Sequence, residues 1–280
     1  LLFLNVESAG EVKFEDDTCK INSKKEKVCN KKMTNSLKFK KGNTDSVMTP
    51  LAIVNFNTHP SNCYIQAETV WGWPSGEDLA QCLNFAKDNN LTHIIFAIEG
   101  TYIIDVNKTI LNNVNNNVFN KIKNNIEEIF KLTHEHRMYY NRGKSAVYLK
   151  NEFNKIFLEP LGMNIMNYNN ILLAWIDLVN NLTLTKLKIL SDNIKTYSNK
   201  IKNINIQNVN QKLINLNIFS ITLIKNSSIQ WNEKLSSEEI FTKLKIINNL
   251  RKDKYLHIKL PTEIKYNAPF ISEKCKLNKK

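Results

Sequence analysis

The sequence predicts a mainly β chain with some helix, arranged as two β-sandwiches in tandem. Beyond residue 145, short β-branched segments recur every 10–14 residues with Asn and Ser between them, a pattern typical of sandwiches. The apolar content of 42% is sufficient for a core, and 280 residues allow one large domain or two of ordinary size. Only seven glycines are present, which disfavours glycine-rich phosphate loops.

The first nine residues resemble the end of a signal peptide. An apolar stretch, Leu1 to Leu4, is followed by the small residues Ser8, Ala9 and Gly10, which suit cleavage. We therefore expect residues 1–9 to be a signal-peptide remnant and the protein to be secreted. The alternative interpretation is that this segment is a first β-strand.

Five cysteines then follow a pattern expected for an oxidising compartment. Local pairing predicts the disulfides Cys19–Cys29 and Cys63–Cys82, although other connectivities stay open. Cys275 lies in a polar tail and is a candidate for an intermolecular disulfide; the alternative is that it closes onto one of the other four.

Residues 10–110 are predicted to form an N-terminal, disulfide-bearing β-sandwich. Its one strong helix signal is 77–87, where Ser75 can cap the first turn and Glu77 and Asp78 complement the helix dipole. The strands predicted by β-branched runs are 51–56, 62–71, 93–98 and 102–106.

Residues 111–144 are predicted to be an Asn-rich insert that grades into a linking helix, and 145–280 a C-terminal sandwich with few cysteines. The helix is indicated by apolar residues at helical spacing from Ile122 to Met138. The strands expected in the second sandwich are 171–179, 182–190, 201–209, 213–224, 241–247 and 255–260. The Lys-interrupted runs 186–202 and 241–254 fit helices as an alternative.

The positive charge of the chain is almost entirely lysine. The formal net charge is +13, with 36 Lys and only three Arg, a bias that A/T-rich codons also produce. Phosphate recognition usually employs the planar fork of Arg, so we expect no nucleic-acid partner. An excess of Lys in 185–265 would suit a sulfated glycan or an acidic protein.

No pattern of catalytic, cofactor-binding or metal-ligating residues stands out. His134 and His136 are two apart and diverge on a helix, so a zinc pair is not expected. Ser75 lacks the Gly-x-Ser-x-Gly context of a nucleophile turn. Glu99 ends a strand as barrel glycosidase acids do, but no partner acid is evident, and we expect a surface carboxylate.

Two further groups of residues can be interpreted either as functional or as ordinary features of composition and packing. Four Asn-x-Ser/Thr sequons, which chance explains in so Asn-rich a chain, are possible glycosylation sites: Asn90, Asn107, Asn181 and Asn226. The aromatic residues Tyr64, Trp71 and Trp73 fit either core packing or a binding hot spot.

The segment 255–275 resembles the last strands of the six-cysteine domains of malaria-parasite surface proteins. In it, an alternating strand runs into Pro261, and a strand bearing Phe270 ends at Cys275. The resemblance implies tandem, degenerate six-cysteine-type β-sandwiches that bind partners without catalysis. The four cysteines of the first half and the single one of the second depart from the family pattern.

These expectations combine into a functional hypothesis. The resemblance implies a non-catalytic secreted adhesion or scaffold subunit of a parasite surface complex used in host-cell invasion, located at the cell surface or in apical secretory organelles. Its partners would be a membrane-anchored adhesin, disulfide-linked as a heterodimer, other complex subunits, and a host receptor or sulfated glycan. It would have no cofactor and no membrane span of its own. The alternatives are a secreted glycosidase-like hydrolase using Glu99, and a mainly helical receptor-binding domain built from 112–255.

Overall fold

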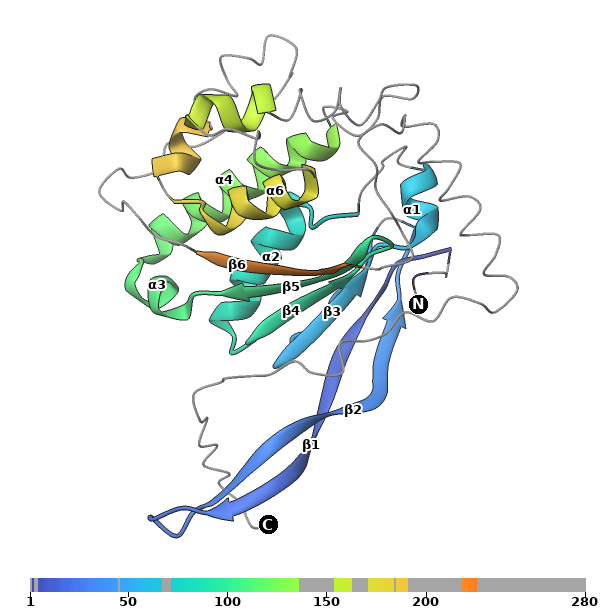
Figure 1. Cartoon of the computed structure of the whole chain (residues 1–280), viewed down its shortest axis with the longest axis vertical. Helices are drawn as coiled ribbons and strands as arrows, with labels where there is room; N and C mark the ends of the chain where they lie inside the picture. The colour runs from blue at the N-terminus through green and yellow to red at the C-terminus, as the bar shows by residue number, and fades with distance from the viewer. Residues whose placement is uncertain are drawn as a thin grey trace.

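The computed structural model combines one β-sheet with helices that lie on one of its faces (Figure 1). It describes residues 2, 5–44, 46–66, 72–135, 154–162, 171–183, 185–190 and 218–225. The predicted coarse class, β with some helix, is confirmed. The predicted strands 201–209, 241–247 and 255–260 lie outside the described residues, as do Cys275 and Asn226.

The sheet has six strands in the order β2-β1-β3-β4-β5-β6, and only β3 and β4 are parallel. The strands are β1 Ser8–Ile21, β2 Lys27–Lys41, β3 Val54–Thr58, β4 Thr92–Phe96, β5 Gly100–Val106 and β6 Phe219–Lys225. The helices are α1 Ser61–Gln66, α2 Gly76–Lys87, α3 Lys108–Asn113, α4 Asn116–Glu135, η1 Asn154–Leu158, η2 Glu159–Leu161 and α6 Ile171–Asn180. In these ranges, no helix has the length and apolar character that a bilayer crossing requires.

Helix α2 begins where the sequence predicts. Ser75 is the N-cap: its hydroxyl accepts from the backbone N–H of Asp78 at 3.1 Å, while the Asp78 carboxylate accepts from the Ser75 N–H at 2.7 Å. This reciprocal pair satisfies two backbone donors that a helix start leaves open. The apolar stripe of α2, including Leu79 and Leu83, is buried against the sheet and α4.

The core is a single cluster that extends from the N-terminus to β6. Trp73 and Trp175 stack at its centre with ring centroids 5.1 Å apart, and Tyr102 and Phe130 meet Trp175 edge-on. Both tryptophans are fully buried, as is Tyr64. For Trp73 and Tyr64, core packing is therefore the correct interpretation; Trp71 lies outside the described residues.

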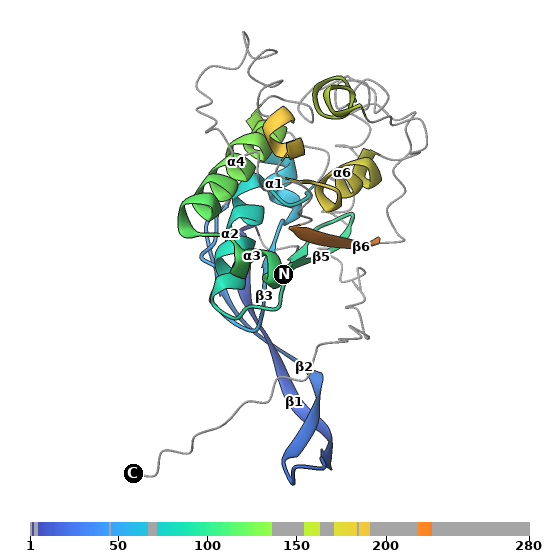
Figure 2. The ribbon, with the colours of Figure 1, turned by 90° about the vertical axis from the view of Figure 1, so that its left-hand side faces the viewer.

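The structure differs from the predicted pair of sandwiches. Strand β6, assigned to the second sandwich, pairs with β5 of the first from Gly100↔Lys225 to Val106↔Phe219. Helices cover one face of this sheet where a sandwich would place a second sheet (Figures 1 and 2). The described elements therefore form one layered body, and the predicted boundary at 111–144 falls inside it.

Several local predictions are corrected. The predicted strand 62–71 begins as helix α1, the strand 171–179 is helix α6, and residues 185–190 of the strand 182–190 are helical. The Asn-rich segment forms α3 and the start of α4, because Asn107 and Asn115 accept helix-capping bonds from Ile110 and Val118. Apolar runs such as 171–179 fit a buried helix as well as a buried strand, so periodicity alone does not separate the two.

The end of the N-terminal segment begins the first strand of the sheet. Leu2 is 3% exposed and belongs to the core cluster, and Ser8 and Ala9 begin β1. The Ser8 N–H donates to the Thr58 hydroxyl at 2.8 Å. Residues 8 and 9 are thus integral to the sheet, and the signal-peptide remnant at 1–9 stays a prediction.

Candidate functional site

The most prominent exposed feature is a two-stranded arm, which we define as residues 13–33. Only Ala9 to Glu11 of β1 pair with β3, whereas β1 continues to pair with β2 as far as Ile21↔Lys27. The arm therefore leaves the body as a twisted ribbon (Figures 1 and 2). Its β1 residues from 15 to 21 are all exposed. Isolated two-stranded hairpins are marginal in water, so this arm needs further support.

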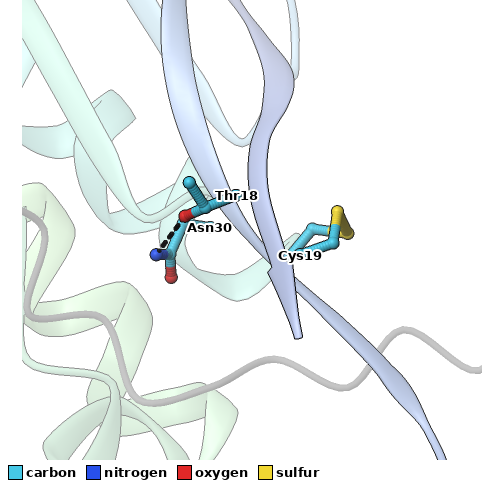
Figure 3. The surroundings of a disulfide bond; sticks show 4 residues. Thr18, Cys19 and Asn30 are labelled. Atoms are coloured by element: carbon cyan, nitrogen blue, oxygen red, sulfur yellow. Dashed lines mark hydrogen bonds between the residues drawn. A yellow bond between two sulfur atoms is a disulfide. The ribbon is translucent and has the colours of Figure 1, made fainter. Parts of the chain in front are cut away.

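A disulfide provides one such support. Cys19 and Cys29 face each other in register and are bonded, which confirms the first predicted pair. On the opposite side of the ribbon, the Asn30 amide donates to the Thr18 hydroxyl at 2.8 Å (Figure 3). Asp16 lies near the two sulfurs, but a disulfide has no thiolate to offer a metal, so this group is not a metal site.

The turn at the tip of the arm is organised by Asn22. Its side-chain oxygen accepts from the backbone N–H groups of Lys24 and Glu26, both at 2.9 Å. The backbone of Asn22 also pairs with Lys25 and Glu26 at 3.0 Å. Lys25 adopts a left-handed conformation with φ 60°, the position that Gly usually occupies in a three-residue hairpin loop. The tip thus has a defined shape.

Lysine dominates the charge of the tip. The side chains of Lys20, Lys24, Lys25 and Lys27 are all exposed, and Glu26 is the one acid between positions 20 and 27. The Glu26 carboxylate accepts from the Asn22 side chain at 2.9 Å. Sequence reasoning did not single out this cluster, because its formation depends on a hairpin that separates it from the body.

The second predicted disulfide, Cys63–Cys82, is not formed. Cys63 lies on α1, and its thiol donates to the Thr44 carbonyl at 2.6 Å. Cys82 is 1% exposed in the apolar stripe of α2, and burial raises its pKa well above the usual value. A protonated, buried thiol of this kind packs as a small apolar side chain and reacts poorly.

Glu99 is buried, not the surface acid that the sequence predicts. Its carboxylate accepts from the hydroxyls of Tyr64 at 2.5 Å and Tyr102 at 2.6 Å, and from the Gly72 N–H at 2.9 Å. Burial raises the pKa of Glu99, and these donors oppose the rise. A Cβ at position 72 would lie 1.8 Å from the Tyr64 hydroxyl, so this contact requires glycine.

The burial of Glu99 favours a structural role. Its side chain is 2% exposed, and its two oxygens already accept three hydrogen bonds. A general acid must reach the bond that it protonates. Through these bonds the Glu99 carboxylate connects three parts of the fold: helix α1, strand β5, and the segment that precedes α2.

A second polar cluster lies near the carboxyl end of β3. The His59 ring faces the Gly72 carbonyl at 2.7 Å through Nδ1 and the Asp78 carboxylate at 3.4 Å through Nε2. Burial opposes protonation of His59, but the charges of Asp78 and Glu7 prevail and raise its pKa to about 9. Between Asn55 and Asn57, burial lowers the pKa of His93 to about 4. One histidine is thus charged and the other neutral at pH 7.

The sequons differ in accessibility. Asn90 is 4% exposed, and its amide donates to the Ala52 and Thr92 carbonyls and to the Asn55 side chain. It is therefore unsuited to glycosylation in the folded chain. Asn107 and Asn181 are exposed, although Asn107 caps α3 and Asn181 bonds Asp177. The side chains of His134 and His136 lie outside the described residues.

Comparison with known proteins gives no family for this chain. No family model matches it, and no solved structure matches it significantly. A stretch of 62 residues is 36% identical to a protein of Frog virus 3 (isolate Goorha) described as uncharacterized protein 3R. This stretch covers 22% of the present chain and 14% of the viral protein. The chain thus spans a small part of the viral relative, and the similarity carries no functional assignment.

Proposed function

We propose that the protein is a non-catalytic secreted binding subunit, of the adhesion or scaffold type, that contacts its partner through the arm. The observation that carries this proposal is the arm itself. It is crosslinked by Cys19–Cys29, and its β1 side chains from 15 to 21 are exposed to solvent. A chain that orders such an element without burying it gains little stability from it, so a binding role explains its presence.

The rest of the described structure supports a binding role over catalysis. Two buried ionisable groups of the described residues are engaged within the fold: Glu99 with two tyrosines, and His59 with Asp78. They connect elements of the fold, as a rigid base for the arm requires. The hydrolase alternative depended on an accessible Glu99, and the burial of this residue does not favour it.

The secreted setting rests on the disulfide. A disulfide between an exposed Cys19 and a half-buried Cys29 persists in oxidising compartments and is rare in reducing ones. A membrane-anchored adhesin linked through Cys275, and a role in a parasite surface complex during host-cell invasion, complete the proposal. They rest on the resemblance of 255–275 to six-cysteine domains. Binding through the arm does not require the tandem-sandwich arrangement that this resemblance implies.

The test is a variant without the arm. Val12 and Leu37 are paired in register, so residues 13–36 can be replaced by Asn-Gly, which suits a two-residue hairpin turn. The pairing of β1 with β3 from Ala9 to Glu11 is retained in this variant. The fluorescently labelled full chain should bind cultured animal cells in flow cytometry, and the shortened chain should not.

Two controls keep the result interpretable. The shortened chain should keep a cooperative thermal transition, with a midpoint lowered somewhat by loss of Phe14, which packs against the core cluster. The full chain should lose binding when the disulfide is reduced. Equal cell binding by the full and shortened chains would defeat the proposal. The proposed linkage through Cys275 has its own test: native material should migrate above the monomer mass in non-reducing electrophoresis. Migration at the monomer mass would refute the intermolecular disulfide and leave binding through the arm untouched.

A further inference from the structure

We infer that the tip of the arm binds a sulfated glycan through Lys20, Lys24, Lys25 and Lys27. This inference rests on the proposed function, because it names the ligand class of the same arm. It requires an exposed cluster of cations, a defined geometry for that cluster, and a reason to prefer this polyanion over others.

The four lysines surround the tip. In the ladder, Lys20 pairs with Val28 and Ile21 pairs with Lys27, so the two strand lysines occupy successive rungs and point to opposite faces. Lys24 and Lys25 lie in the turn that joins the strands. Positive charge is therefore presented on both faces and at the end of the ribbon, an arrangement that suits a chain with sulfates distributed along its length.

The conformation of Lys25 is the most informative detail. Outside glycine, the described chain has positive φ angles only at Lys25, 60°, and Asn89, 69°. Asparagine tolerates this region, whereas lysine has no side-chain compensation for it. Glycine at position 25 would relieve the strain, so the lysine costs stability in the turn. A side chain kept at a strained position is explained if the ammonium group has a use.

The cluster is also held in place before any ligand arrives. The disulfide lies one rung from Lys20, and Asn22 fixes the turn through two backbone hydrogen bonds. Fixing cations in advance lowers the ordering cost that binding would otherwise carry. The net charge of +13 over the whole chain also steers polyanions toward the protein.

A sulfated glycan fits better than nucleic acid or an anionic membrane. The Cys19–Cys29 disulfide indicates an extracellular setting, where nucleic acid is an uncommon partner. All cations of the tip are lysines, which act as point charges and lack the fork that reads bases or clamps phosphates. Ile21 is 76% exposed but is the one large apolar side chain at the tip, too little for membrane insertion.

The central experiment is Lys25→Gly in the full chain, with heparin as the probe. The variant should resist urea as well as wild type or better, because the turn is relieved of strain, yet its affinity for heparin should fall about two- to fivefold, as expected for one exposed ion pair. Its slope of log affinity against log salt should decrease by about one. The matched control, Asn89→Gly, changes the other left-handed residue and should leave heparin affinity unchanged.

Three comparisons identify the ligand class. Wild type should bind heparin more tightly than desulfated heparin, duplex DNA or phosphatidylserine vesicles at equal salt. Tighter binding to DNA or to vesicles would overturn the inference, as would equal heparin affinity of Lys25→Gly and wild type.

The inference and the proposed function can fail separately. If the shortened chain loses cell binding but heparin lyase treatment of the cells leaves wild-type binding intact, the glycan inference fails and the binding arm stands. If the shortened chain binds cells as well as wild type, the arm is not the contact element and both fail.

Discussion

The charged state of His59 predicts a specific loss of stability at alkaline pH. Its pKa is raised from 6.5 to about 9 in the folded protein, against the opposing effect of burial, by Asp78 and Glu7. As an imidazolium, it can donate through Nδ1 to the Gly72 carbonyl at 2.7 Å and face Asp78 at 3.4 Å. A histidine whose pKa is higher in the folded than in the unfolded state stabilises the folded protein. The stabilisation is complete at pH values below the unfolded-state pKa and is lost as pH rises through the folded-state pKa.

The size of this effect follows from the shift. At roughly 1.4 kcal/mol per pKa unit, the shift corresponds to about 3 kcal/mol below pH 6.5, lost between pH 6.5 and 9. The lowered pKa of Asp78 is the same interaction measured from its partner, so it adds nothing further. The His side chain is 12% exposed, and little of this energy is screened by solvent.

Urea denaturation of wild type and His59→Gln at pH 6, 7, 8 and 9.5 measures the effect. The difference in free energy of unfolding should be largest at pH 6 and should shrink by about 2–3 kcal/mol at pH 9.5. Lysines, tyrosines and thiols that titrate in the same range are common to both proteins and cancel in the difference. A gap that stays constant from pH 6 to 9.5 would refute the assignment of charge to His59.

Three other substitutions test the remaining structure. Tyr102→Phe removes one donor to the buried Glu99 and should lower the free energy of unfolding by about 1.5–3 kcal/mol; a loss under about 0.5 kcal/mol would mean that this bond is not charge-assisted. Ser75→Ala should cost about 1 kcal/mol through loss of the α2 cap, whereas Ser75→Gly should cost only a few tenths; equal losses would contradict the capping role. Replacing Cys19 and Cys29 by Ser should lower stability by about 2–3 kcal/mol and accelerate amide exchange in the arm, and unchanged exchange would show that the hairpin needs no staple.

Signals confined to a few neighbouring residues were read correctly from the sequence. The Ser75 cap of α2 depends only on positions 75 to 78, and the Cys19–Cys29 bond only on a short hairpin. The predicted strands 51–56, 93–98 and 102–106 overlap β3, β4 and β5, because their β-branched runs are flanked by polar or turn residues. These features are decided by local physics.

Features that depend on distant contacts were missed. The local sequence around Glu99 predicts a surface acid. Its burial depends on a hydrogen bond from the hydroxyl of Tyr64, 35 residues away in the sequence. Helix α6 has an apolar run that a buried strand would share, and its true state follows from packing around Trp175. Cys63 and Cys82 are close enough in sequence to pair, but they belong to two separate helices. In each case the deciding partner lies in another element of the fold.

Strand β1 belongs to both the arm and the central sheet, which has a mechanical consequence. Because the same strand ends in the arm and pairs with β3 through Ala9, Gly10 and Glu11, a force that draws the tip away from the body enters the central sheet along β1. The hydrogen bonds at these three rungs would then be loaded in shear and would have to break together, whereas peeling would rupture them singly. The arm would therefore resist a pulling force through three rungs of the sheet at once.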